Sequence, residues 1–179
     1  SEVDEVIKRL EELVERHRRK VEEVIRRLEK LAEDHERKVR ELEKRLRELI
    51  KRIEELARRD GPREEKVRDV RRKLRTLLKE LRDTTEELKK TIRELEKELN
   101  ETTKKIVDEI RRLRERVNVT SRDFDRLEDV ARRVKEDLER TDEEVRRVAE
   151  EVRKRVEKTT RDVERVVREV ERAIEERRR

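Results

Sequence analysis

The sequence contains no cysteine, methionine, tryptophan or tyrosine, and it has a single glycine, a single proline and a single phenylalanine among 179 residues. Without cysteine, disulfides, thiolate metal sites and cysteine nucleophiles are excluded. The scarcity of turn-forming and aromatic residues disfavours β-sheets. No apolar run approaches 18 residues, so we expect no transmembrane helix. Residues 1–5 have neither a basic leader nor an apolar core, so we expect no signal peptide. We expect a soluble chain, whose cellular location the sequence does not define.

The sequence also has no large excess of charge of one sign, since it contains 57 lysines and arginines and 51 acidic residues. Acids and bases alternate within nearly every helical turn. The densest basic stretches, residues 16–20 and 177–179, are short and have no neighbouring aromatic that could stack on bases. We therefore expect no specific nucleic-acid partner and no membrane partner, only weak, salt-sensitive attraction to polyanions.

Helix-breaking residues occur at two places only. Gly61 and Pro62 suit the end of one helix and the start of the next, and Asn118 can end a second helix before Thr120 or Ser121 caps a third. The predicted helices are residues 2–59, 62–117 and 121–178. Because connections this short force antiparallel neighbours, the sequence predicts an all-α fold, a single antiparallel up-down-up three-helix bundle over residues 1–179.

Apolar residues recur every 18 residues within each predicted helix. The block Ile7–Val14 returns as Ile25–Ala32, and the later helices repeat in the same way: Val70, Leu88 and Ile106; Leu74, Ile92 and Ile110; Leu127, Val145 and Val163; Val134, Val152 and Val170. Eighteen residues complete five turns, which favours long, nearly straight helices over a heptad supercoil. Each helix has one apolar stripe, and three such stripes can bury one another, which predicts a monomer. The alternative is an interaction module in which helices exchange between chains.

A few polar residues interrupt the stripes, again in pairs 18 residues apart. Folding the chain at its two turns brings them into two equivalent layers, which are His17, Thr103 and Thr141, and His35, Thr85 and Thr159. Neutral imidazole and threonine hydroxyls can satisfy one another by hydrogen bonds, so we interpret these layers as structural devices that penalise a wrong register. Thr84, Asn100 and Thr102 flank the layers and either extend or border them.

Other chemistry at these layers is disfavoured. Each layer has one imidazole and, on this interpretation, no carboxylate, which is too few ligands for zinc and leaves no acidic partner to orient a catalytic histidine. We expect no catalytic residues, no metal site, no cofactor and no enzyme activity. A pH response is the alternative, because an imidazolium at His17 or His35 could not accept a hydrogen bond from threonine and would be buried with its charge.

The whole chain resembles de novo designed three-helix bundles of the parametric, untwisted, 18-residue-repeat kind. The resemblance rests on three near-equal helices, the Asp60-Gly61-Pro62 turn, the restricted set of residue types and the regularly spaced polar layers in a Leu/Ile/Val core. It implies a very stable scaffold whose buried hydrogen-bond networks give packing specificity, with no evolved substrate or partner. Natural spectrin-type repeats are less similar, because they have aromatic core residues and a heptad period.

Overall fold

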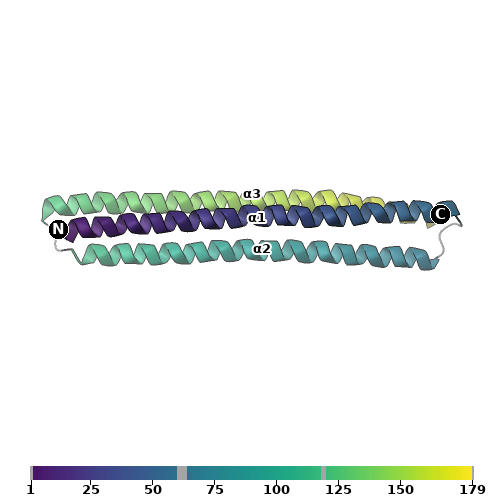
Figure 1. Ribbon diagram of the computed structural model, residues 1–179, viewed down its shortest axis with the longest axis horizontal. Helices are drawn as coiled ribbons and strands as arrows, with labels where there is room; N and C mark the ends of the chain where they lie inside the picture. The colour runs from purple at the N-terminus through teal and green to yellow at the C-terminus, as the bar shows by residue number, and fades with distance from the viewer. Residues whose placement is uncertain (1, 60–63, 118–119, 179) are drawn as a thin grey trace. The chain divides into compact units, whose positions relative to one another are not determined.

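The fold is all-α, as predicted, in the part of the chain that the structure describes (Figure 1). A computed structural model describes residues 2–59, 64–117 and 120–178. The helices are α1 (Glu2–Arg59), α2 (Glu64–Glu115) and α3 (Ser121–Arg178). The predicted turn residues Asp60, Gly61, Pro62, Asn118 and Val119 lie outside the described residues.

The helix ends carry the charges that helix dipoles favour. Acidic residues occupy the first turn of each helix, and arginines occupy the last turns of α1 and α2. The carbonyl of Thr120 accepts the Phe124 N–H at 3.2 Å, which places Thr120 at the N-cap position of α3. The second helix was predicted to end at residue 117, but α2 ends two residues earlier. Val117 N–H bonds three residues back, to the Arg114 carbonyl, so the last turn tightens and the α-helix ends at Glu115.

The contacts divide the chain into two compact units, each containing a segment of all three helices. Unit 1 is residues 1–29 with 91–151, and unit 2 is residues 30–90 with 152–179. The division into two units does not test the expectation of a single domain over residues 1–179, which stays a prediction.

Ion pairs between α1 and α2 define the relative direction of these two helices in unit 1. Arg9 on α1 pairs with Glu109 on α2 at 2.7 Å, and Lys20, further along α1, pairs with Glu98, earlier on α2. Partners therefore descend α2 as they ascend α1, so these two helices are antiparallel.

The core of unit 1 is built from the repeating apolar positions of all three segments. One cluster of its buried members consists of Val3, Val6, Leu10, Leu13, Val14, Ile106, Ile110, Leu127, Ala131, Val134 and Leu138. Full burial of one leucine or isoleucine side chain is worth about 1.5–3 kcal/mol, so this stripe supplies the main stabilising term.

Unit 2 repeats the arrangement with the next copies of the same pattern. One cluster of its buried members consists of Val39, Leu42, Leu46, Leu49, Ile53, Val67, Val70, Leu74, Leu77, Leu81, Val163, Val166, Val167, Val170 and Ile174. Leu46, Leu49 and Ile53 of this core continue the 18-residue spacing of α1.

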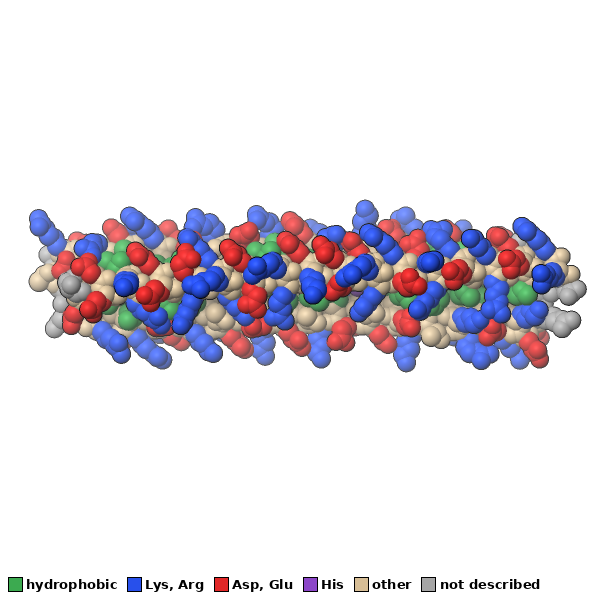
Figure 2. Space-filling view, in the orientation of Figure 1, with side chains coloured by type: hydrophobic (Ala, Val, Ile, Leu, Met, Phe, Trp, Pro, Cys, Tyr) green, Lys and Arg blue, Asp and Glu red, His purple; other side chains and the backbone are tan. Residues whose placement is uncertain are grey.

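Outside the cores the surface is charged. Figure 2 shows acidic and basic side chains interspersed over the visible face, with small hydrophobic areas between them. Phe124 is the one large apolar side chain exposed among the described residues, with 46% of its surface accessible. None of the helices in the described ranges has an apolar window long enough to cross a bilayer.

Candidate functional site

The most elaborate polar cluster surrounds His17, in unit 1. The side chain of His17 is fully buried in α1, one turn beyond the core residue Leu13. Its Nδ1 lies 3.1 Å from Thr141 Oγ1 on α3, and its Nε2 lies 3.2 Å from Thr103 Oγ1 on α2. The structure therefore brings together all three residues of the first predicted layer.

A fourth member, Asp142, was missed by the sequence interpretation, which expected no carboxylate at the stripe. Asp142 is 6% exposed and follows Thr141 on α3. Its Oδ1 lies 2.9 Å from His17 Nε2, and its Oδ2 accepts a hydrogen bond from Thr103 Oγ1 at 2.9 Å. His17, Thr103 and Asp142 form a closed ring of hydrogen bonds between three helices, which we call the His17 cluster together with Thr141.

The spacing of buried residues on α3 contains a signal that identifies Asp142. It stands four residues after Leu138 and three before Val145, and both neighbours are about 1% exposed. This is the step that keeps a residue on one helical face. The spacing is easily overlooked because Asp142 is acidic, and aspartate side chains are usually exposed to solvent.

The geometry fixes one proton of the His17 cluster. An ionised carboxylate only accepts, so His17 Nε2 must carry the hydrogen that points at Asp142. Thr141 Oγ1 lies near His17 Nδ1 and also donates to the Asp137 carbonyl at 2.9 Å. Rotation of this hydroxyl lets it donate to a neutral Nδ1 or accept from a protonated one. Both nitrogens of the His17 ring therefore have a hydrogen-bond partner.

His35, one repeat later in unit 2, has fewer partners. It is 2% exposed, and its Nε2 lies 3.3 Å from Thr85 Oγ1. Its Nδ1 is the one buried side-chain nitrogen or oxygen without a hydrogen-bond partner in the described part of the chain. Because a bare acceptor costs less than a bare N–H, the favoured neutral form has the proton on Nε2, donated to Thr85.

The second layer therefore differs from the first, which corrects the expectation of equivalence. Thr159 Oγ1 donates to the Arg155 carbonyl at 2.8 Å and makes no hydrogen bond to His35. The residue equivalent to Asp142 is Thr160, whose hydroxyl donates to the Val156 carbonyl at 2.8 Å. Threonine is too short and too occupied with its own helix to replace the carboxylate.

The flanking polar residues do not extend the networks. Thr102 Oγ1 donates to the Glu98 carbonyl of its own helix at 3.0 Å. Asn100 is exposed, and Thr84 is half-buried beside Thr85. Residues 84, 100 and 102 are thus border positions.

Burial lowers the pKa of His35, because desolvation disfavours the imidazolium. Nearby Glu36 opposes this effect on the pKa and Lys38 adds to it. Among the described residues, no carboxylate makes a hydrogen bond to the His35 ring. The second histidine is thus held in a site that favours its neutral form.

Asp137, one turn before Thr141, is the second buried acid of α3, at 6% exposure. Burial by itself raises its pKa, but hydrogen bonds and charges from Arg18 and Arg140 outweigh burial and lower the pKa. Arg140 donates to Oδ1 at 2.7 Å. Asp137 therefore stays ionised and ties α3 to α1 through Arg18.

The arrangement offers little for catalysis or metal binding. Thr141, His17 and Asp142 stand in the order of a nucleophile, a base and an acid, but His17 is fully buried. Nowhere in residues 2–59, 64–117 and 120–178 do three His, Asp or Glu side chains gather to hold a metal ion.

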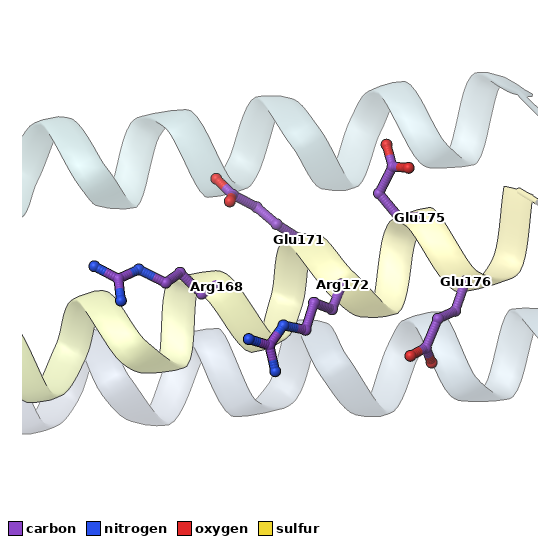
Figure 3. A pocket seen from close by; sticks show the side chains of 5 residues that line it. All are labelled: Arg168, Glu171, Arg172, Glu175 and Glu176. Carbon is purple, nitrogen blue, oxygen red and sulfur yellow. The ribbon is translucent and has the colours of Figure 1, made fainter.

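The hollows on the surface of unit 2 are open and charged. One, of about 400 Å³, is lined by Arg168, Glu171, Arg172, Glu175 and Glu176, all from α3 (Figure 3). Another, of about 390 Å³, lies between α2 and α3, where Thr85 and Thr160 border it. Neither converges polar groups on one point as a substrate site does.

Comparison with known proteins gives a similarity to solved structures. No family model and no curated protein matches the chain. Among solved structures, the chain is similar to a "Computationally designed three helix bundle", with 17% identity over 99% of this chain and 84% of that one, and a TM-score of 0.41.

Proposed function

We propose that this chain is a structural scaffold of the designed kind, whose role is to hold its own helices in a defined packing and which catalyses no reaction. The support is the 18-residue repeat, the restricted set of residue types and the buried cores that the repeat produces. Within this scaffold, the His17 cluster gives specificity.

The observation that carries the proposal is the completeness of the His17 cluster. Four side chains from three helices pair in the interior of unit 1. A shift of any helix by one residue would leave an imidazole or a carboxylate buried without partners, at a cost of about 1–3 kcal/mol for each group. Apolar contacts are less selective, because leucine and valine tolerate many neighbours.

An apolar replacement of the cluster tests the proposal. The variant combines His17→Leu, Thr103→Val, Thr141→Val and Asp142→Leu. We expect it to unfold at equal or higher urea concentration, because a buried ionic network is often no more stable than a packed apolar one. We also expect it to lose its single packing, seen as broadened or doubled methyl signals in NMR spectra.

The matched control changes the second layer alone, by His35→Leu with Thr85→Val. Because that layer is incomplete, we expect its spectra to keep one sharp set of signals. A quadruple variant with spectra as sharp and single as those of the parent would contradict the proposal.

A further inference from the structure

Two ion pairs at equivalent positions of the repeat have opposite polarity. In unit 1, Arg18 on α1 donates to Asp137 on α3, with both contacts at 3.3 Å. Eighteen residues later on both helices, in unit 2, the acid is on α1 and the base on α3. Arg155 donates to Glu36 at 2.6 and 3.1 Å.

At the α2–α3 interface of unit 1, one ion pair can be compared with the residue types found one repeat away. Arg114 on α2 pairs with Glu128 on α3, with Nε 3.0 Å from the carboxylate. One repeat away along this antiparallel pair, the residues are Glu96 on α2 and Arg146 on α3. The signs of the two positions are again exchanged.

Pairs between α1 and α2 keep one polarity. Lys20 pairs with Glu98 in unit 1, and Arg45 pairs with Glu80 at 3.4 Å in unit 2, so α1 carries the base both times. Among these pairs, the exchange of sign is confined to the interfaces of α3.

The exchange of charge sign between repeats distinguishes registers of α3 that the apolar core does not distinguish. If α3 docked one repeat out of register, its apolar stripe would still be buried, because the stripe has the same period. In one direction His35 would even gain Thr141 and Asp142 as partners. The ion pairs would fail, since Arg155 would face Arg18, or Asp137 would face Glu36.

A displacement of α3 by one repeat is possible only when α3 comes from a second copy of the chain. Eighteen helical residues span roughly 27 Å, whereas the five residues between α2 and α3 reach at most about 17 Å. An α3 from another molecule has no such tether. Docked out of register, it would leave its own site open for a further copy, which gives open-ended association.

We propose that the alternating ion pairs of α3 exclude out-of-register docking of α3 from a second copy of the chain. This inference rests on the proposed scaffold function, because it concerns how the scaffold avoids self-association. Arg18, Glu36, Asp137 and Arg155 are then specificity-determining residues.

The test gives the α1–α3 ion pairs of the two repeats the same polarity. The variant Glu36→Arg with Arg155→Glu keeps an ion pair in the native register but gives it the polarity of Arg18 and Asp137. After unfolding and refolding at high concentration, we expect roughly three- to tenfold more high-mass species than the parent forms, as expected for turning one partly exposed ion pair from repulsive to attractive. Size exclusion with light scattering measures the fraction.

The matched control adds Arg18→Glu and Asp137→Arg to this variant, so that all polarities reverse and alternation returns. It should refold with the parent's fraction of high-mass species. A two-residue variant that matches the parent, or a control that associates as much as that variant, would overturn the inference. If the charge exchange impairs folding, Glu36→Gln with Arg155→Gln replaces it, with a smaller rise expected and an unchanged fraction counting against the inference.

A failure of the scaffold function would appear elsewhere. A parent chain that is itself associated contradicts the closed scaffold, whereas the inference concerns only the ratio between the variants and the parent.

Discussion

Among single residues, two α3 positions distinguish the two histidine sites. Asp142 accepts from both His17 and Thr103, whereas Thr160, one repeat later, bonds only to its own helix. The partner of Nδ1 differs at a second position, because Thr141 lies beside the Nδ1 of His17 whereas Thr159 makes no hydrogen bond to His35.

We expect Asp142→Ala to lower the free energy of unfolding by about 1–3 kcal/mol, because it leaves the His17 Nε2–H and the Thr103 hydroxyl short of an acceptor. Thr160→Ala is the matched control at the equivalent position. It should cost less than about 1 kcal/mol, since it removes only a hydroxyl that bonds to a carbonyl already in the helix. Urea unfolding measures both, and equal losses would show that the carboxylate is not structural.

His35 should make stability depend on pH. Because burial holds its pKa in the folded state below the unfolded value of 6.5, the unfolded chain takes up the proton first as pH falls. Stability should be full above about pH 6.5 and decrease below it, until folded His35 is itself protonated.

The variant His35→Leu with Thr85→Val should lose this part of the pH dependence while keeping any from carboxylates at lower pH. Urea midpoints between pH 7.5 and 4.5 test it. Parallel curves for the variant and the parent would exclude His35 as the source.

Repetition explains which parts of the site could be predicted from the sequence. His17, Thr103 and Thr141 were predictable because each interrupts an apolar stripe at a matched height. Asp142 was not, because a carboxylate in a chain with 51 acidic residues reads as surface. The failure of Thr159 to reach His35 depends on the length and rotation of a side chain, which no periodicity specifies.

Among the helices, α3 depends most on its neighbours. It buries leucine only at Leu127 and Leu138 and uses mostly valine elsewhere, whereas α1 buries leucine at residues 10, 13, 28, 42, 46 and 49. Valine is a weaker helix former than leucine, so the helicity of α3 must come from packing.

A peptide of residues 121–179 should accordingly be less helical than one of residues 1–59 at the same concentration, by circular dichroism at 222 nm. Concentration series that exclude self-association provide the control. A peptide of residues 121–179 that is equally helical would show that intrinsic propensity and ion pairs within α3 are sufficient.

The extent of the helices was predictable because breakers are confined to two places. The start and end of α1 and the start of α3 agree with the predicted bounds. The end of α2 differs because its last turn tightens through a bond between Val117 and Arg114, a backbone detail that residue type does not determine.

For the whole molecule, stability rests on the buried apolar side chains of the three helices rather than on the many ion pairs. Most of those pairs are exposed, and exposed pairs contribute about 0–1 kcal/mol each. The cores use the apolar stripe of every helix segment, which leaves no continuous apolar face on the described helices for a partner.

The chain should therefore be monomeric. Light scattering after size exclusion at neutral pH and moderate salt should give a mass near 22.2 kDa. A tenfold dilution serves as the control and should leave the mass unchanged. A mass of twice this value or more would favour helix exchange between chains and would make the polar layers intermolecular.

Phe124 has a practical consequence for optical work. The chain has no tryptophan or tyrosine, so it is nearly invisible at 280 nm and has no strong intrinsic fluorophore. Because the Phe124 ring is 46% exposed in the first turn of α3, Phe124→Trp would place a single emitter there without entering the core. Its emission would report on unit 1, and a second tryptophan at an exposed position of unit 2 would show whether the two units open together.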